Sequence, residues 1–183
     1  TQFGIKTTEG LGMALIFTLY AIVMLSLYGG KLPTIFIKRM KTNPYEARMR
    51  AMLIFAFIPL VVLFAQPLGT YSPWFPVILI GIGCAAHQSW SANIYTTVSD
   101  MFPKNAIATV TGIGGMAGGV SSMLMQACAG NLFVYADEVQ LEFLGFVGKP
   151  AGYFIIFCIC SVAYLVGWII MKTLVPRYKI IGS

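Results

Sequence analysis

Long apolar runs constrain this chain more than any other feature of its sequence. The first run, residues 11–30, contains no charged side chain, and a helix needs roughly 20 apolar residues to cross the hydrocarbon core of a bilayer. Of the 183 residues, 58% are hydrophobic and 10% are charged, whereas a soluble domain has about 25% charged residues. A soluble core cannot bury this much apolar sequence, so the excess is expected to face lipid.

Five runs predict membrane-spanning helices, at about residues 11–30, 51–66, 75–98, 106–135 and 151–171. The second run is short, but Arg48 and Arg50 can lengthen it by reaching toward the membrane surface. The Pro-rich residues 66–76 and the segment 99–105, in which Pro103 breaks the helix, predict turns between the spans. Leu165 in the fifth span is expected to face lipid. The predicted fold class is an all-α membrane protein.

Basic residues are strongly biased to one side of these spans. Ten Lys and Arg residues lie in loops on the side of the C-terminus, and only Lys6 and Lys149 lie on the other side. Cytoplasmic loops carry the excess of Lys and Arg, so the C-terminus is expected to be cytoplasmic. Topology also explains the net charge of +6. No nucleic-acid partner is expected, because the basic residues are not interleaved with stacking aromatic side chains.

The third span is the most polar of the five. Its polar and amphipathic side chains are His87, Gln88, Ser89, Trp90, Ser91, Asn93, Tyr95, Thr96 and Thr97. On a helix of 3.6 residues per turn, His87, Gln88, Trp90, Ser91 and Tyr95 share one broad arc. Asn93 lies toward the back of the helix and is a weaker candidate for contact with substrate. Aromatic rings can stack on a sugar ring, and the other side chains can hydrogen-bond hydroxyls or a carboxylate. The arc therefore predicts a water-filled path for a sugar acid or a similar substrate. The alternative is hydrogen bonding between helices, worth about 0.6–2 kcal/mol per contact.

His87 is the only histidine of the chain and the only ionisable side chain expected near the middle of the membrane. An imidazole can gain a proton near neutral pH, so one role is to carry a coupled proton. A second role, which we favour, is that of a neutral hydrogen-bond donor to substrate. A third is that of a purely structural histidine.

Glycines dominate the middle of the fourth span. Gly112, Gly115 and Gly119 recur at helical spacing, and Gly114 and Gly118 form a G-x-x-x-G pair. This pattern predicts close approach of another helix rather than a phosphate-binding loop, which requires a preceding strand. Polar residues continue this side of the helix outward, at Ser122 and Gln126.

Nothing in the sequence indicates catalysis. The four cysteines, which lie in apolar runs without a C-x-x-C motif, are predicted to be small buried hydrophobic side chains and not metal ligands; they are Cys84, Cys128, Cys158 and Cys160. All six acidic residues lie in loops or at helix ends. Neither an enzyme, nor a metal site, nor a cofactor is expected.

Two neighbouring stretches resemble a known family. Residues 86–104 (A-H-Q-S-W-S-A-N-I-Y-T-T-V-S-D-M-F-P-K) and 111–119 (T-G-I-G-G-M-A-G-G) resemble helices ten and eleven of major facilitator transporters, in the hexuronate transporter branch of the anion:cation symporter family. The resemblance runs over essentially the whole chain. It implies helices eight to twelve, most of the C-terminal six-helix bundle, partnered by an N-terminal half.

The resemblance also implies a function and a set of contacts. The function is uptake of a hexuronate with protons across a bacterial inner membrane, by rocking of two halves around a central site. Substrate contacts carried over from the family are His87, Trp90, Ser91 and Tyr95, together with Gly115 and Ser122. One position departs from the family pattern: Thr34 stands where the acid of a G-x-L-x-D loop would be. A cytoplasmic gate built on that acid is therefore not expected.

A second hypothesis belongs to another functional class. The chain would then be a non-transporting membrane subunit or receptor that binds a partner through its glycine-rich helix. A third hypothesis, an intramembrane enzyme, would need a catalytic acid or metal site outside this chain.

Overall fold

A computed structural model describes residues 5–6 and 8–180 of the chain. Its elements follow in this order: α1 (Gly10–Val23), η1 (Met24–Tyr28), α2 (Lys31–Met40), α3 (Pro44–Phe57), η2 (Ile58–Phe64), α4 (Ala65–Gly69), α5 (Trp74–Met101), α6 (Lys104–Glu138), β1 (Glu142–Phe143), β2 (Phe146–Val147) and α7 (Lys149–Leu174). They form two compact units. Of the described residues, the first comprises 5–6, 8–97 and 161–178, and the second comprises 98–160 and 179–180.

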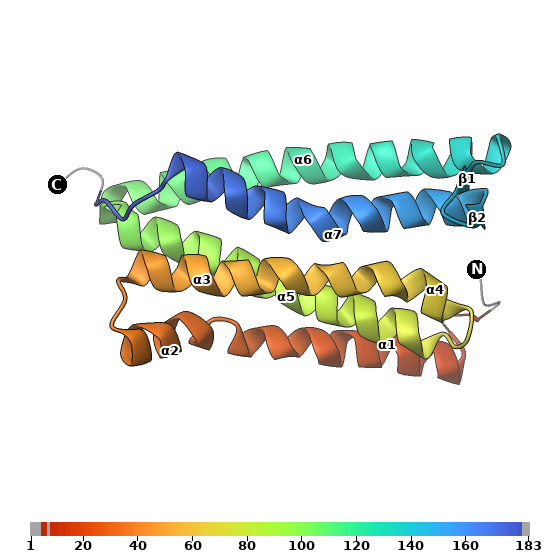
Figure 1. The fold of residues 1–183 in the computed structure, drawn as a ribbon, viewed down its shortest axis with the longest axis horizontal. Coiled ribbons are helices and arrows are strands. Elements are labelled where there is room, and N and C mark those ends of the chain that lie inside the picture. Colours follow the sequence, from red (N-terminus) through yellow and green to blue (C-terminus); the bar gives the residue numbers. More distant parts are fainter. Residues whose placement is uncertain (1–4, 7, 181–183) are drawn as a thin grey trace. The chain divides into compact units, whose positions relative to one another are not determined.

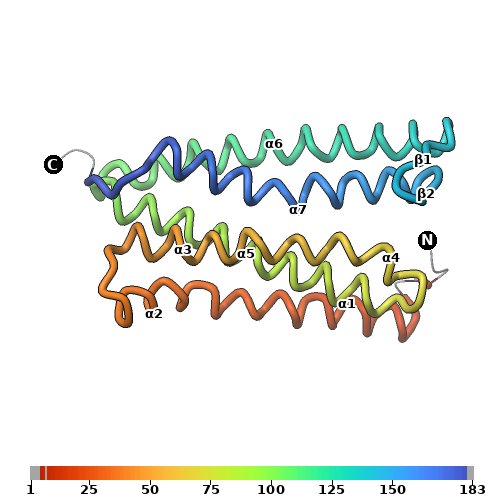
Figure 2. Tube along the Cα trace, viewed as in Figure 1, coloured from red at the N-terminus to blue at the C-terminus, as the bar shows by residue number. Residues whose placement is uncertain are grey.

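Two helical runs of opposite direction begin the first unit. The run α1–η1–α2 lies beside the returning run α3–η2–α4 (Figures 1 and 2). The reversal between them is set by local chemistry. Lys41 ends α2 in a left-handed conformation with φ of 49°, and the Asn43 side chain caps α3 by accepting a hydrogen bond from the Glu46 backbone N–H at 2.8 Å. Pro44 at the first position of α3 is favourable, since that position needs no N–H donor.

The core of the first unit joins three helices. Its buried cluster consists of Ala51, Met52, Phe55 and Ala56 from α3 and Trp90 from α5, and the α7 side chains Tyr164, Leu165, Trp168 and Met171 pack against it. Trp168 fixes α7 to α3, because its Nε1 donates to the Met49 carbonyl at 2.8 Å. The prediction that Leu165 faces lipid was therefore wrong. Its position on α7, one residue after Tyr164 and three before Trp168, turns it toward this core.

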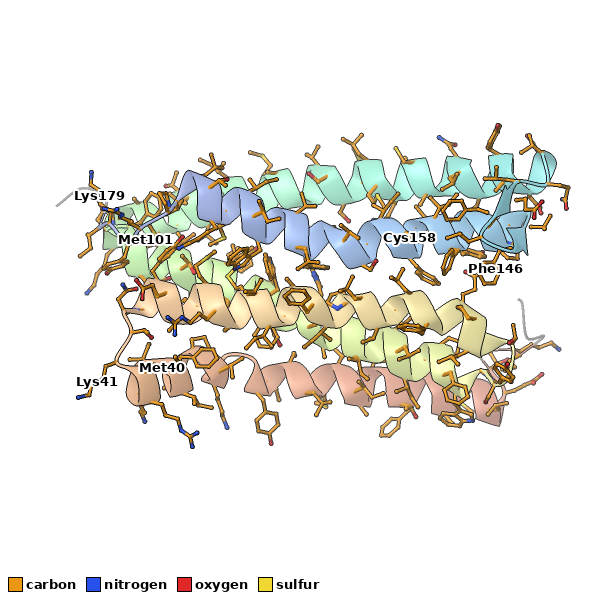
Figure 3. The ribbon with its side chains drawn as sticks, in the orientation of Figure 1. Met40, Lys41, Met101, Phe146, Cys158 and Lys179 are labelled. Atoms are coloured by element: carbon orange, nitrogen blue, oxygen red, sulfur yellow. The ribbon has the colours of Figure 1, made fainter. Side chains whose placement is uncertain are left out.

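The second unit pairs α6 with the first part of α7. Gly152 allows the approach, since a Cβ at this position would lie 3.1 Å from the Phe133 ring, and the rings of Phe133 and Tyr153 have centroids 4.5 Å apart. Strands β1 and β2 form a hairpin between the two helices. Its turn residues Leu144 and Gly145 both have positive φ, as a type I′ turn requires. Phe146, labelled in Figure 3, anchors the hairpin on α7 with its ring 5.0 Å from that of Phe154.

The predicted fold class, an all-α membrane protein, is confirmed by the helices of the chain and by their apolar length. Among the described residues, four helical runs are long and apolar enough to cross a bilayer: Gly10–Met40, Pro44–Gly69, Lys104–Glu138 and Lys149–Leu174. They contain the first, second, fourth and fifth predicted spans. The third prediction, 75–98, coincides with α5, which has 28 residues but is not one of the four apolar runs. Its polar segment makes it less apolar than the others. That α5 crosses the membrane and that the five helices belong to one bundle remain predictions.

The turn predicted at 99–105 is present but shorter, because only residues 102–103 lie outside the helices. Helix α5 ends at Met101 and α6 begins at Lys104. Pro103 between them is extended, with ψ of 151°, and it cannot continue the preceding helix because it lacks a backbone N–H.

The prediction of buried cysteines was wrong for this chain. Cys84 and Cys158 are partly exposed, and Cys128 and Cys160 are exposed. All four are free thiols on helices. Their apolar sequence neighbours predicted burial, but in a membrane protein an apolar neighbour is equally compatible with a surface that faces lipid.

Candidate functional site

Helix α5 has a polar face that is buried within the first unit. Ser89, Asn93 and Thr97 recur every four residues and are 3%, 1% and 5% exposed. Each side chain donates to the backbone carbonyl four residues earlier, at 2.8, 2.8 and 2.7 Å respectively. Small polar side chains commonly bond their own helix in this way. These three side chains are therefore buried while each donates a hydrogen bond to a backbone carbonyl of α5 itself.

This buried face is packed very closely against the junction of η1 and α2. A Cβ at Gly29 would overlap the Ser89 side chain and would lie 3.0 Å from the Ser26 carbonyl oxygen. Ser89 Oγ also lies 3.5 Å from that carbonyl, which is long for a hydrogen bond. The contact therefore depends mainly on the missing side chain of Gly29 rather than on hydrogen bonding between helices.

Asn93 combines deep burial with an unused acceptor. Its Nδ2 bonds the Ser89 carbonyl, while its Oδ1 is buried and has no hydrogen-bond partner among the described residues. Asn93 lies on the back of α5, as the helical spacing predicted. Its predicted contact with substrate stays a prediction.

The opposite face of α5 is open and polar. His87, Gln88 and Tyr95 are exposed, and Ser91 is half-buried. The structure therefore brings these four predicted site residues together on one side of the helix. Trp90 differs from them. It is 7% exposed and belongs to the core cluster, so the arc of five predicted residues consists of four open positions and one at its buried edge.

His87 is held by a partner that sequence reasoning missed. Its Nδ1 lies 2.7 Å from the hydroxyl of Tyr164 on α7, and the two rings meet edge to face with centroids 5.9 Å apart. Tyr164 also contacts the Trp90 ring edge to face at 5.7 Å. The available signal was weak: a tyrosine deep in an apolar run, four residues before Trp168. This spacing places both polar tips on one side of the helix.

Gln88 borders a groove that α5 shares with α1 and η1. The groove has a volume of about 470 Å³, within the range of small-molecule sites. Its other lining residues are Phe17, Tyr20, Ala21, Val23, Met24, Ser26 and Leu27. The groove is lined mostly by apolar side chains, and Tyr20, Ser26 and Gln88 are the polar ones among them.

Gly115 and Ser122 belong to the second unit and are described apart from α5. Both are exposed on α6. Ser122 Oγ accepts a hydrogen bond from Gln126 Nε2 at 3.2 Å, so the polar side predicted for this helix is present. A Cβ at Gly112, Gly114, Gly115, Gly118 or Gly119 would meet nothing within 4 Å. Within the second unit, the close helix packing predicted from these glycines is therefore not made.

Known proteins resemble part of this chain. No family model matches it, and no solved structure matches it. The hexuronate transporters of Escherichia coli strain K12 and of Escherichia coli O157:H7 are each 32% identical to it over 107 residues. The aligned region covers 57% of the chain and 24% of each relative, so the chain matches about a quarter of their length. Over that region, this membrane protein is similar to a transporter.

Proposed function

We propose that the chain is part of a secondary active transporter that takes up a small organic anion, such as a hexuronate, together with protons by alternating access. The observation that carries the proposal is the open polar face of α5, formed by His87, Gln88, Ser91 and Tyr95. Lipid does not stabilise such a face, because polar groups inside the hydrocarbon region are costly unless they meet water or protein. Similarity to two hexuronate transporters supports the same role.

The face suits a hexuronate chemically. A hexuronate carries several hydroxyl groups and one carboxylate, and a carboxylate only accepts hydrogen bonds. The His87 ring and the Gln88 amide can donate to it, the Ser91 hydroxyl can bond a sugar hydroxyl, and the Tyr95 ring can stack on the sugar. We propose that an N-terminal half of the transporter faces these residues across a water-filled path.

We further propose that the protein lies in a bacterial inner membrane with a cytoplasmic C-terminus. Lys172 near the end of α7 lies with its Nζ 5.5 Å from the centre of the Tyr45 ring, at the start of α3. The Tyr45 hydroxyl donates to the Val175 carbonyl. These contacts join the end of α7, which carries Lys172, to the start of α3 within the first unit. The proposal agrees with the charge bias that marks cytoplasmic loops.

The relatives are transporters, which agrees with the prediction that the chain is not an enzyme. The hypothesis of a non-transporting subunit is favoured by one observation only, the glycines of α6 that meet nothing in their own unit. Both hypotheses require a partner for that helix, and an uptake assay separates them.

The test is uptake of radiolabelled glucuronate by proteoliposomes that contain the full protein, under an inward proton gradient. His87→Ala is expected to reduce uptake at low substrate concentration by about tenfold or more, since a hydrogen bond to a charged group contributes about 1.5–3 kcal/mol. The control is Ile169→Ala on α7, whose side chain is 55% exposed. Trp90→Ala is a poorer test, because it also removes a core side chain. Absence of uptake by the wild type, or an equal effect of the two substitutions, would overturn the proposal.

A further inference from the structure

The only histidine of the chain is bonded through one of its two ring nitrogens. The Tyr164 hydroxyl lies 2.7 Å from His87 Nδ1. His87 Nε2 makes no hydrogen bond to any residue that the structure describes, and the ring lies on the exposed face of α5. Since Nδ1 is occupied from α7, Nε2 is the nitrogen that remains for a ligand.

The hydroxyl that occupies Nδ1 is itself well positioned. The Tyr164 ring packs edge to face on Trp90, which is 7% exposed. Close to Tyr164 on the same helix, a Cβ at Gly167 would lie 3.9 Å from the Trp90 ring. One turn after Tyr164, Trp168 bonds the Met49 carbonyl of α3. Packing on Trp90 and the hydrogen bond from Trp168 to α3 therefore fix the position of the Tyr164 hydroxyl.

We propose that Tyr164 is a positioning residue: its hydroxyl donates to His87 Nδ1 and holds the neutral imidazole in the tautomer that carries its proton on Nε2. In that tautomer Nε2–H is a donor aimed at the open side of α5. In the other tautomer, Nδ1–H would donate to the Tyr164 oxygen and Nε2 would be an acceptor.

The choice of tautomer determines which ligand group His87 binds. A carboxylate accepts hydrogen bonds and donates none, so it pairs with Nε2–H and is repelled by an Nε2 lone pair. A hydrogen bond to the second ring nitrogen commonly fixes the tautomer of a functional histidine. On the proposed function, on which this step rests, His87 Nε2–H would bind the carboxylate of the organic anion, and Tyr164 would keep that donor ready before the anion arrives.

The tautomer is measured directly by nitrogen NMR of the full protein with ¹⁵N-labelled histidine, in lipid nanodiscs at alkaline pH. The His87→Gln variant identifies the His87 signals by their loss. The expected result for the wild type is a protonated Nε2 and an unprotonated Nδ1. Tyr164→Phe keeps the ring on Trp90 and removes only the hydroxyl, so it should fold and give a mixture of both tautomers.

A matched control is Tyr153→Phe, on the same helix and packed on Phe133 in the second unit. It should leave the His87 signals unchanged. A wild type with its proton on Nδ1, or a Tyr164→Phe variant with the wild-type tautomer, would overturn the positioning role.

A second arm tests the ligand separately. Glucuronate is expected to shift the Nε2 signal of the wild type, and Tyr164→Phe should raise its apparent Kd by about two- to fivefold, because only part of the population then presents the donor. In uptake assays the same change should appear in KM and not in the maximal rate. If the tautomers behave as expected but glucuronate leaves Nε2 unmoved, the proposed function fails at this site while the role of Tyr164 stands.

Discussion

Helices α5 and α6 both carry few charges and many small residues, yet they meet their surroundings in different ways. Three small polar side chains of α5, Ser89, Asn93 and Thr97, are buried, and Ser89 packs directly on Gly29 of the facing segment. On α6, a Cβ added at any of the glycines would have no atom within 4 Å beyond its chain neighbours and the adjacent backbone of its own helix. Among the described residues of this helix, only Ala136 is buried.

This difference shows that a stripe of small residues has no packing consequence until a second surface is present. Gly29 is followed by one further glycine, Gly30, and belongs to no G-x-x-x-G pattern, but its missing side chain is required by Ser89. The G-x-x-x-G pair of α6 is a much stronger sequence signal for helix packing, and the second unit provides no surface for it. The partner that α6 needs is, in our proposal, the other half of the transporter.

The largest expected effect separates these two kinds of glycine. Gly29→Ala should destabilise the protein by about 3 kcal/mol, the upper part of the range for overpacking, because the new Cβ would overlap Ser89. Gly118→Ala on α6 should be neutral or stabilising by up to about 1 kcal/mol, since alanine favours a helix over glycine. The measurement is thermal unfolding in detergent, followed by circular dichroism.

Two outcomes would break the comparison. A Gly118→Ala protein as unstable as Gly29→Ala would mean that α6 is already packed in the isolated protein. A harmless Gly29→Ala would mean that α5 does not approach the junction of η1 and α2 as closely as described.

Sequence reasoning found the parts of the fold that depend on local composition. Charge-free runs located four apolar helices, and Pro103 located the break between α5 and α6. Sequence reasoning missed the contacts between residues that are far apart in the chain. Helical spacing placed Trp90 at the edge of a polar arc, but only the packing of α7 decides that this edge is covered. The partner of His87 lies 77 positions away at Tyr164, and no local period encodes such a pairing.

A smaller effect is expected at the buried polar face of α5. Asn93→Leu removes one bond to the Ser89 carbonyl together with an acceptor, Oδ1, that is buried without a partner among the described residues. A hydrogen bond contributes about 0.5–1.5 kcal/mol, whereas a buried polar group without a partner costs about 1–3 kcal/mol. The two effects of the substitution therefore oppose each other, and we expect a change in unfolding free energy within about 1 kcal/mol. The check is unfolding in detergent beside glucuronate uptake. A stable variant without uptake would assign Asn93 to the substrate path, whereas a loss of several kcal/mol would show that Oδ1 has a bound partner, such as a buried water.

The smallest expected effect on stability is on the open side of α6. Ser122→Ala removes an exposed hydrogen bond from Gln126, and substitutions at exposed positions usually change stability by no more than about 0.5 kcal/mol. If this side of α6 faces the substrate path, the substitution should reduce uptake clearly while leaving the unfolding free energy nearly unchanged. The reason is that the Ser122 hydroxyl would then bind substrate and contribute little to the fold. The matched control is Thr173→Ala at the end of α7, whose hydroxyl donates to the Ile170 carbonyl of its own helix. Equal uptake by the two variants would remove Ser122 from the proposed site. The difference between α5 and α6 would then be one of packing and not of contact with substrate.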